Sequence, residues 1–422
     1  MNGAAAGLPP GPLRVLATVL LPFAAGYFCS YLLRAVNAVV APDLVAAVGL
    51  SAGDLGLLTA AYFLTFALLQ VPLGVALDRW GPRRVQAALL AIATVGILLF
   101  ALAETRTGLF AARAVIGFGM AGGLMAALKA ITLWVPRERW PLVNGCFMAM
   151  GGLGALAATA PAEAALHFVD WRSLFVGLAA ITAGAAALVL FLVPEKPATA
   201  APGRLADQFA AVARIYRDPF FWRITPAAVA TLGITMAIQT LWAGPWLRDV
   251  GGLGREAAAA YLLAIAAALT AGFALSGVVT DILVRRGVAL TRVMGGALVL
   301  LIAVQALITF QVAAPSLLLW VLFGLLSNGA IVFFPILNRH FPPELAARVN
   351  TATNLLNFGI GFAAQAAIGW IIDLWPATDG RYPPDAYRWA FAAMLAVQVL
   401  ALLWFLAPGT PPVSRPGRRH RA

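Results

Sequence analysis

The sequence is poor in charged residues. Asp, Glu, Lys and Arg make up 11% of its 422 residues, whereas 62% of the residues are hydrophobic. A soluble domain has roughly 25% charged and 45–50% apolar residues, so this composition excludes both a soluble globular protein and a disordered one. Apolar stretches of about 20 residues predict transmembrane helices instead.

Cysteine and histidine are also scarce, with two and three residues. Cys29 and Cys146 both lie in apolar stretches, which indicates small hydrophobic side chains and no disulfide framework. The sequence contains no paired metal-ligand histidines, no nucleotide-binding Gly-Lys-Ser loop and no serine elbow. We therefore expect no enzyme, no metal site and no cofactor.

The apolar stretches predict an all-α polytopic membrane protein with about twelve transmembrane helices in two pseudo-symmetric six-helix bundles. The long polar connection 194–223 divides the spans into an N-terminal bundle (1–193) and a C-terminal bundle with a basic cytoplasmic tail (224–422). The first stretch is too long for a cleaved signal peptide. The expected spans are 15–40, 53–76, 85–103, 107–134, 143–166, 173–193, 224–247, 257–280, 289–311, 315–338, 349–374 and 386–407.

The net charge of +12 is distributed unevenly. Lys and Arg concentrate in the connections on the side of the N-terminus and are sparse on the other side, which predicts that both termini are cytoplasmic. The charge is therefore a determinant of topology, so we expect the lipid bilayer as a partner and no nucleic acid. The compact loops favour a bacterial inner membrane.

An internal repeat relates the two halves. Positions 74, 78 and 83 recur at 277, 281 and 286, each 203 residues later, and positions 136, 138, 143 and 144 recur 206 residues later. Two matches at nearly one offset indicate that the last six spans repeat the first six. The residues of the first repeated loop are Gly74, Asp78, Arg79, Gly81, Arg83 and Arg84, and those of its second copy are Gly277, Asp281 and Arg286.

The loop with Gly74, Asp78 and Arg83 resembles the signature of the major facilitator superfamily between its second and third helices. The resemblance extends over the whole chain through the span count, the central loop and the repeat. It implies two bundles around a central cavity that opens alternately to each side of the membrane. Members of this superfamily are secondary transporters.

The loop residues suit a gating role. Asp78 can pair with an arginine or a helix N-terminus, while Gly74 and Gly81 allow close helix approach and a tight turn. A charge cluster of this kind would hold one conformation closed, although a topology anchor is the alternative. The second copy has Ile282 where the first has Arg79, which indicates a weaker latch.

Arg34 is an ionisable residue inside the first span. Tyr27, Tyr31 and Arg34 are spaced four and three residues apart, so they share one helix face. A guanidinium cannot lose its proton and needs an anion or an acceptor. We interpret Arg34 as an anion clamp that faces the cavity, with a structural pair as the alternative.

The first span also resembles that of the organophosphate:phosphate antiporters, through Gly26-Tyr27, Tyr31-Leu32, Arg34, Ala38 and Pro42. The resemblance implies that Arg34 binds the anionic group of the substrate. The antiporters use a second arginine in the seventh helix, where this chain offers Gln239 and Trp242. A carboxylate therefore fits the single arginine better than a phosphate ester.

Three further ionisable residues lie within spans. Lys129 is a candidate for transient anion binding, or its ammonium extends to the membrane interface. Arg113 resembles the fourth-helix arginine of the superfamily and is a candidate for proton coupling or bundle structure. Desolvation suits Glu163 to proton carriage, with pairing to an outer arginine as the alternative.

Polar side chains form a stripe along the eleventh span. Asn354 and Asn357 are candidate substrate contacts in the cavity, with helix–helix hydrogen bonding as the alternative. Tyr62 and Gln70 in the second span share a face in the same way.

Three functions remain open from the sequence. The first is uptake of a small, anionic organic solute together with protons by a monomer. The second is proton-driven efflux of amphipathic compounds. The third is a polytopic membrane enzyme or sensor, which would need a catalytic cluster that the sequence lacks.

Overall fold

The computed structural model describes residues 12–195, 205–342, 345–378 and 380–407. The predicted basic tail and part of the central connection therefore lie outside the described residues. Within them the chain forms helices and one isolated β-bridge between Thr378 and Arg381. This agrees with the predicted all-helical membrane protein.

The helices of the first half run from α1 to α9. Helix α4 begins with a capping box between Ser51 and Asp54. Asp170 caps the start of α9, because its carboxylate accepts from the Ser173 N–H. Such caps satisfy backbone donors that have no partner within the helix. The elements are α1 (Pro12–Val15), η1 (Leu16–Leu20), α2 (Leu21–Ala35), α3 (Asn37–Val48), α4 (Ala52–Leu102), α5 (Arg106–Met120), α6 (Gly123–Trp134), η2 (Arg137–Arg139), α7 (Trp140–Ala157), α8 (Ala160–Leu166) and α9 (Trp171–Leu192).

The second half begins after a helix in the central connection. This helix, α10, lies within the segment predicted as a loop, and α11 starts at Pro219, five residues before the predicted span. The elements are α10 (Leu205–Tyr216), α11 (Pro219–Ala237), η3 (Ile238–Trp242), α12 (Ala243–Asp249), α13 (Arg255–Arg285), α14 (Leu290–Thr309), α15 (Leu317–Leu326), η4 (Gly329–Val332), α16 (Phe333–His340), α17 (Ala346–Ile372) and α18 (Pro384–Leu406).

The number of membrane passes agrees with the prediction. Eleven helical segments of the described chain are long and apolar enough to span a membrane. One of them, α4, has 51 residues and turns at Gly81, whose φ of 76° and ψ of 161° interrupt the helix. Counting the two limbs of α4 separately gives twelve passes.

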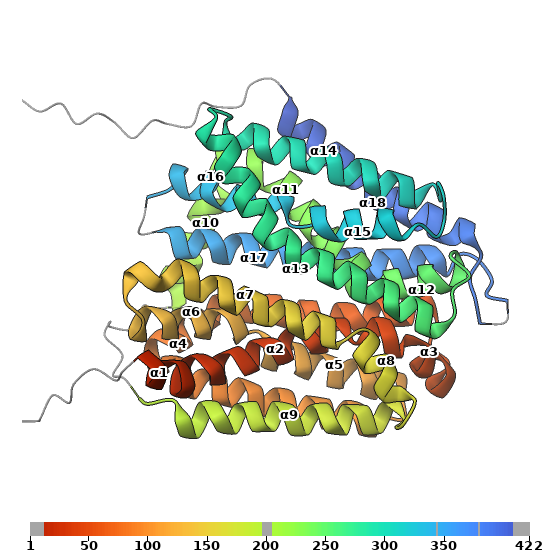
Figure 1. The fold of residues 1–422 in the computed structure, drawn as a ribbon, viewed down its shortest axis with the longest axis horizontal. Helices are drawn as coiled ribbons and strands as arrows, with labels where there is room; N and C mark the ends of the chain where they lie inside the picture. Colours follow the sequence, from red (N-terminus) through yellow and green to blue (C-terminus); the bar gives the residue numbers. More distant parts are fainter. Residues whose placement is uncertain (1–11, 196–204, 343–344, 379, 408–422) are drawn as a thin grey trace, which may run out of the picture.

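The two halves form two layers (Figure 1). Helices α1–α9 lie together in one layer and α11–α18 in the other, with α4 packed against α17 and α7 against α13 where the layers meet. Helix α10 lies at one end of the molecule and α8 at the other, and we call these the α10 end and the α8 end (Figure 1). The predicted bundle boundaries at residues 193 and 224 stay a prediction.

Candidate functional site

Arg34 lies among aromatic rings from three helices. The carbon of its guanidinium is 4.7 Å from the ring centroid of Tyr31 in α2, 5.3 Å from that of Phe66 in α4 and 5.4 Å from that of Phe358 in α17. The rings of Phe66 and Phe358 are themselves 4.2 Å apart. Both halves of the chain therefore enclose Arg34, and we call these four residues the Arg34 site.

The guanidinium of Arg34 is not neutralised within the protein. Its Nε is buried without a hydrogen-bond partner, and no ion pair joins Arg34 to a carboxylate of the described residues. Removing a charge from water costs several kcal/mol, and a cation–π contact returns only about 0.5–2 kcal/mol. The side chain is half-buried, so an anion that reaches it would supply the missing charge and acceptors.

The two tyrosines predicted beside Arg34 are next to it along α2. The rings of Tyr27 and Tyr31 are 5.0 Å apart, edge to face, and the Tyr27 hydroxyl lies 3.7 Å from Sδ of Met148. Gly151 of α7 leaves room for both rings, because a Cβ there would lie 2.7 Å from Tyr27 and 3.1 Å from Tyr31. Helix α7 thus supports the face that carries Arg34.

Arg113, Tyr62 and Gln70 make contacts that hold the first half together. Arg113 is fully buried, donates from Nη2 to the Leu33 carbonyl at 2.9 Å and lies 5.1 Å from the Tyr62 ring. The Tyr62 hydroxyl donates to the Ser30 carbonyl at 3.4 Å, and the Gln70 amide donates to two backbone carbonyls. These contacts fit the structural interpretation of Arg113, and its role in proton coupling stays a prediction.

Gln239 and Trp242 belong to the π-helical turn η3, a feature that often occurs at functional sites. Gln365 of α17 donates to the carbonyl of Ala237, just before the turn, at 3.1 Å. Gln239 is half-buried, whereas Trp242 is 1% exposed with an unpartnered indole N–H. The turn therefore packs against α17, and the substrate contacts predicted for both residues stay predictions.

The asparagines of α17 lie next to the Arg34 site. Asn354 precedes Phe358 by one helical turn, so the two side chains share a face. Asn354 and Asn357 are both half-buried, and Oδ1 of Asn357 is buried without a partner. This placement suits the predicted substrate contacts, which the structure leaves as predictions.

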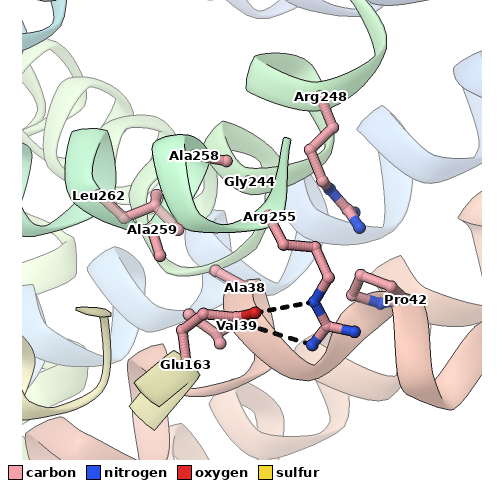
Figure 2. Close-up of a pocket in the computed structure, with 10 residues that line it drawn as sticks. All are labelled: Ala38, Val39, Pro42, Glu163, Gly244, Arg248, Arg255, Ala258, Ala259 and Leu262. Carbon is pink, nitrogen blue, oxygen red and sulfur yellow. Dashed lines mark hydrogen bonds and ion pairs between the residues drawn. The ribbon is translucent and has the colours of Figure 1, made fainter. Parts of the chain in front are cut away.

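An ion-pair cluster joins the two halves at the α8 end. Arg255, the first residue of α13, donates to both carboxylate oxygens of Asp43 in α3, from Nη1 at 2.9 Å and from Nη2 at 2.8 Å. It also donates from Nε to Glu163 of α8 at 2.9 Å, and Arg248 lines the same small pocket (Figure 2). Glu163 is thus paired with an arginine at the α8 end, which fits the pairing considered above as the alternative. Its proton-carrying role stays a prediction.

A second contact at the α8 end caps α4 with a residue of the other half. The Asp373 carboxylate, just after α17, accepts from the Ser51 hydroxyl at 2.7 Å and from the backbone N–H groups of Ala52 and Gly53 at 3.0 and 2.8 Å. The Tyr382 hydroxyl donates to the same carboxylate at 2.7 Å. Burial raises the pKa of Tyr382 to about 12, so this phenol remains a donor at neutral pH.

The first loop motif makes its contacts within one half. Asp78 accepts from Lys129 of α6 at 2.7 Å, and Arg84 forms an ion pair with Glu195 at 2.5 Å. The ammonium of Lys129 is therefore engaged by the motif, and its predicted binding of substrate stays untested. Gly81 makes the expected tight turn, but the expected close approach at Gly74 is absent, because no atom lies within 4 Å of a Cβ built there.

The hydrogen bonds, ion pairs and ring contacts that the structure describes for the remaining motif residues also stay within one half. Arg83 donates to the Leu190 carbonyl of α9, and Arg79 lies over the neighbouring Trp80 ring. In the second copy, Asp281 pairs with Arg285 one turn further along α13. No atom lies within 4 Å of a Cβ built at Gly277, and no ion pair of Arg286 occurs within the described residues. The predicted gating role of both copies therefore remains a prediction.

The sequence analysis did not identify Phe66, Phe358, Asp43, Arg255 or Asp373 as site residues. Phe66 follows Tyr62 by one turn and Phe358 follows Asn354 by one turn, so helical spacing could have added both rings to the predicted faces. Asp43 lies beyond the predicted end of the first span at residue 40, whereas α3 continues to Val48. Its pairing with Arg255 joins residues 212 positions apart, and no local pattern marks such a pair.

The sequence is similar to those of known transport proteins over most of its length. The sequence model of the Major Facilitator Superfamily matches residues 23–366. The probable sulfoacetate transporter SauU of Cupriavidus necator is 25% identical over 90% of this chain and 91% of its own. The hexuronate transporter of Escherichia coli K12 is 28% identical over 36% of this chain and 35% of its own.

A solved structure has a similar fold over almost the whole chain. A bacterial homologue of the human lysosomal transporter Spinster, in an inward-facing and unoccupied conformation, has a TM-score of 0.74. It is 20% identical, and the match covers 94% of this chain and 97% of that chain. The similarity extends to the helical architecture of both halves.

Proposed function

Because the chain belongs to the Major Facilitator Superfamily, we propose that it is a secondary transporter that moves a small organic anion by alternating access. The observation that carries the proposal is the unpaired guanidinium of Arg34, held between rings of both halves. A site shared by two halves changes when the halves move relative to one another. An anion bound there would therefore meet a different environment in each conformation.

The chemistry of Arg34 favours a substrate with one carboxylate or sulfonate. A guanidinium presents paired N–H donors that match a planar or trigonal oxyanion. The probable sulfoacetate transporter and the hexuronate transporter are named for substrates that carry such groups, which supports this class. Asn354 and Asn357 would contact the uncharged part of the substrate through their amides.

We further propose that uptake is driven by protons, that the chain acts as a monomer, and that it lies in the bacterial inner membrane. Both termini would be cytoplasmic, as the distribution of Lys and Arg favours. The α10 end would then face the cytoplasm and the α8 end the outside. Glu163 would carry the proton, because it is a carboxylate that is 5% exposed within a membrane-spanning segment.

The test is a thermal-shift screen of the purified protein against carboxylates, sulfonates, sugar phosphates, amino acids and lipophilic cations. A ligand that binds the folded state raises the melting temperature by mass action. We expect an organic anion to stabilise the wild type and Arg34→Ala to lose about 10- to 150-fold in affinity, the equivalent of about 1.5–3 kcal/mol for a charge-assisted hydrogen bond.

Two controls sharpen this screen. Arg34→Lys keeps the charge but removes the planar donor pair, and we expect it to retain part of the affinity. Arg388→Ala removes an arginine that pairs with Asp385 within its own helix and should bind the anion as the wild type does. Stabilisation by lipophilic cations alone, equal in wild type and Arg34→Ala, would replace the anion proposal with efflux of amphipathic compounds.

A further inference from the structure

The four residues of the Arg34 site include no carboxylate that could bind a proton beside the substrate. Neither Arg34 nor the neighbouring Arg113 forms an ion pair within the described chain, and three of their guanidinium nitrogens are buried without partners. Arginine does not lose its proton in proteins. The proposed coupling to protons must therefore use carboxylates elsewhere.

Such carboxylates occur at the α8 end, where two of them share one guanidinium. Asp43 and Glu163 both belong to the first half, and Arg255 belongs to the second half. One guanidinium serves both carboxylates, so it holds α13 to α3 through Asp43 and to α8 through Glu163. Each protonation would remove one of the two ion pairs by which Arg255 joins the halves.

The other charged groups around the cluster do not cancel its negative charge. Glu256 of α13 faces His167, just after α8, at 3.6 Å. Arg248 of α12 lines the small pocket beside Arg255, and Asp170 lines the larger cavity beside Glu163. More carboxylates than guanidinium groups thus lie around Arg255. The titratable and charged side chains around it are Asp43, Glu163, His167, Asp170, Arg248 and Glu256.

Water can reach the cluster from outside the helices. A cavity of about 630 Å³ is lined by Asp43, Glu163, His167 and Arg255, and the Arg255 side chain is 39% exposed. A proton donor in this cavity would lie next to the carboxylate oxygens that hold Arg255. The cluster therefore combines proton access with a contact between the halves.

We propose that Asp43 and Glu163 form a proton-binding site that locks the α8 end through Arg255 and releases it on protonation. A carboxylate oxygen takes a proton from water in the cavity, its ion pair with Arg255 is lost, and α13 separates from α3 and α8. The proton and the substrate would then act at different places, one at the gate and the other at Arg34. This inference rests on the proposed transport function, which gives the proton-binding site its role. Its test needs no substrate and does not depend on that function.

The test measures opening of the α8 end without any substrate. Spin labels at Phe168 and Leu374, both highly exposed at the α8 end, would be placed in a background in which Cys29 and Cys146 are changed to serine. Double electron–electron resonance then reports the distance between the halves as the pH is lowered from about 8 to about 5. We expect a rise in the long-distance population for the wild type.

The variants assign the response to its residues. Glu163→Gln and Asp43→Asn should show the long-distance population already at high pH and lose most of the pH response. Asp385→Asn removes a carboxylate whose ion pair lies within one helix at the same end and should respond as the wild type does. Elution volume and melting temperature confirm that each variant is folded.

Three results would overturn the proposal. These are a wild type without a pH response, an unchanged response in both Glu163→Gln and Asp43→Asn, or loss of the response in Glu256→Gln, which would assign it to His167. Arg34→Ala should keep the response. Failure of anion binding at Arg34 would therefore contradict the proposed function and leave this distance measurement as a separate result.

Discussion

The two ends of the molecule differ in how their polar residues are paired. At the α8 end, Arg255 and Asp373 each join residues of one half to residues of the other. At the α10 end, the first loop motif pairs within a half, as Asp78 does with Lys129. Helices α7 and α13 also diverge toward the α10 end (Figure 1). Side-chain hydrogen bonds and ion pairs therefore join the halves at the α8 end, whereas the first loop motif at the α10 end is paired within its own half.

The charges of the loop with Asp78 are paired with residues of the same half, so these ion pairs do not hold the two halves together. The predictions below test which contacts decide between the two ends.

The largest effect is expected from a bulky residue at Gly56. A Cβ there would lie 2.5 Å from the Gln365 carbonyl and 3.2 Å from Trp242, so Gly56→Val separates α4 from α17 at the α8 end. Overpacking of this kind costs roughly 1–3 kcal/mol or more. Distance measurements at the α8 end should show opening, and transport should fall more than about tenfold.

Gly74→Val is the matched control on the same helix. Nothing lies within 4 Å of a Cβ at Gly74, so the α8 end should remain closed in this variant. Equal opening in both variants would show that the glycine contacts do not decide which end is sealed.

A smaller shift is expected for Asp373→Asn. The carboxylate accepts from three donors of the first half and from the Tyr382 hydroxyl of its own half. An amide keeps its shape but loses its charge and one acceptor. A charge-assisted hydrogen bond contributes about 1.5–3 kcal/mol, so the ratio of closed to open molecules should fall by about 10- to 150-fold at most. Distance measurements between spin labels at Phe168 and Leu374, which leave the cap residues in place, would report this change. An unchanged distance distribution would contradict the role of this cap.

Phe358→Ala should weaken anion binding moderately. The change removes one ring from the guanidinium of Arg34 and the contact with Phe66, each worth about 0.5–2 kcal/mol. We expect a decrease in affinity of about 3- to 30-fold in a binding titration. Phe362→Ala, one turn further along α17, is the control, and an equal loss in both would point to a general effect on the helix.

The smallest effect is expected at the α10 end. Lys129 and Asp78 are about one-third exposed, at 34% and 32%, and such ion pairs contribute about 0–1 kcal/mol. A double-mutant cycle with Lys129→Met and Asp78→Asn should give a coupling energy in that range from thermal unfolding. A much larger coupling would mean that this pair, and not the α8 end, holds the conformation.

Much of the architecture could be predicted from local sequence. The length of the apolar stretches predicted the membrane passes, and the spacing of residues along the helix placed Tyr27, Tyr31 and Arg34 on one face. Both depend only on residues that are close in the chain. The partners of Arg34 and Glu163 could not be predicted in this way. Phe358 and Arg255 lie in the other half, and which residues meet across the halves depends on the conformation as well as on the helix faces.

The turn at Gly81 has a mechanical consequence. Its φ and ψ lie in a region that only glycine adopts without strain, and the helix continues on both sides without a connecting loop. The two limbs of α4 are therefore connected directly. Neither limb can move along its axis while the other stays in place. The limb before Gly81 carries Phe66 at the Arg34 site, and the limb after it packs against α5. Movement of Phe66 along the helix axis would therefore also move the contact between the second limb and α5.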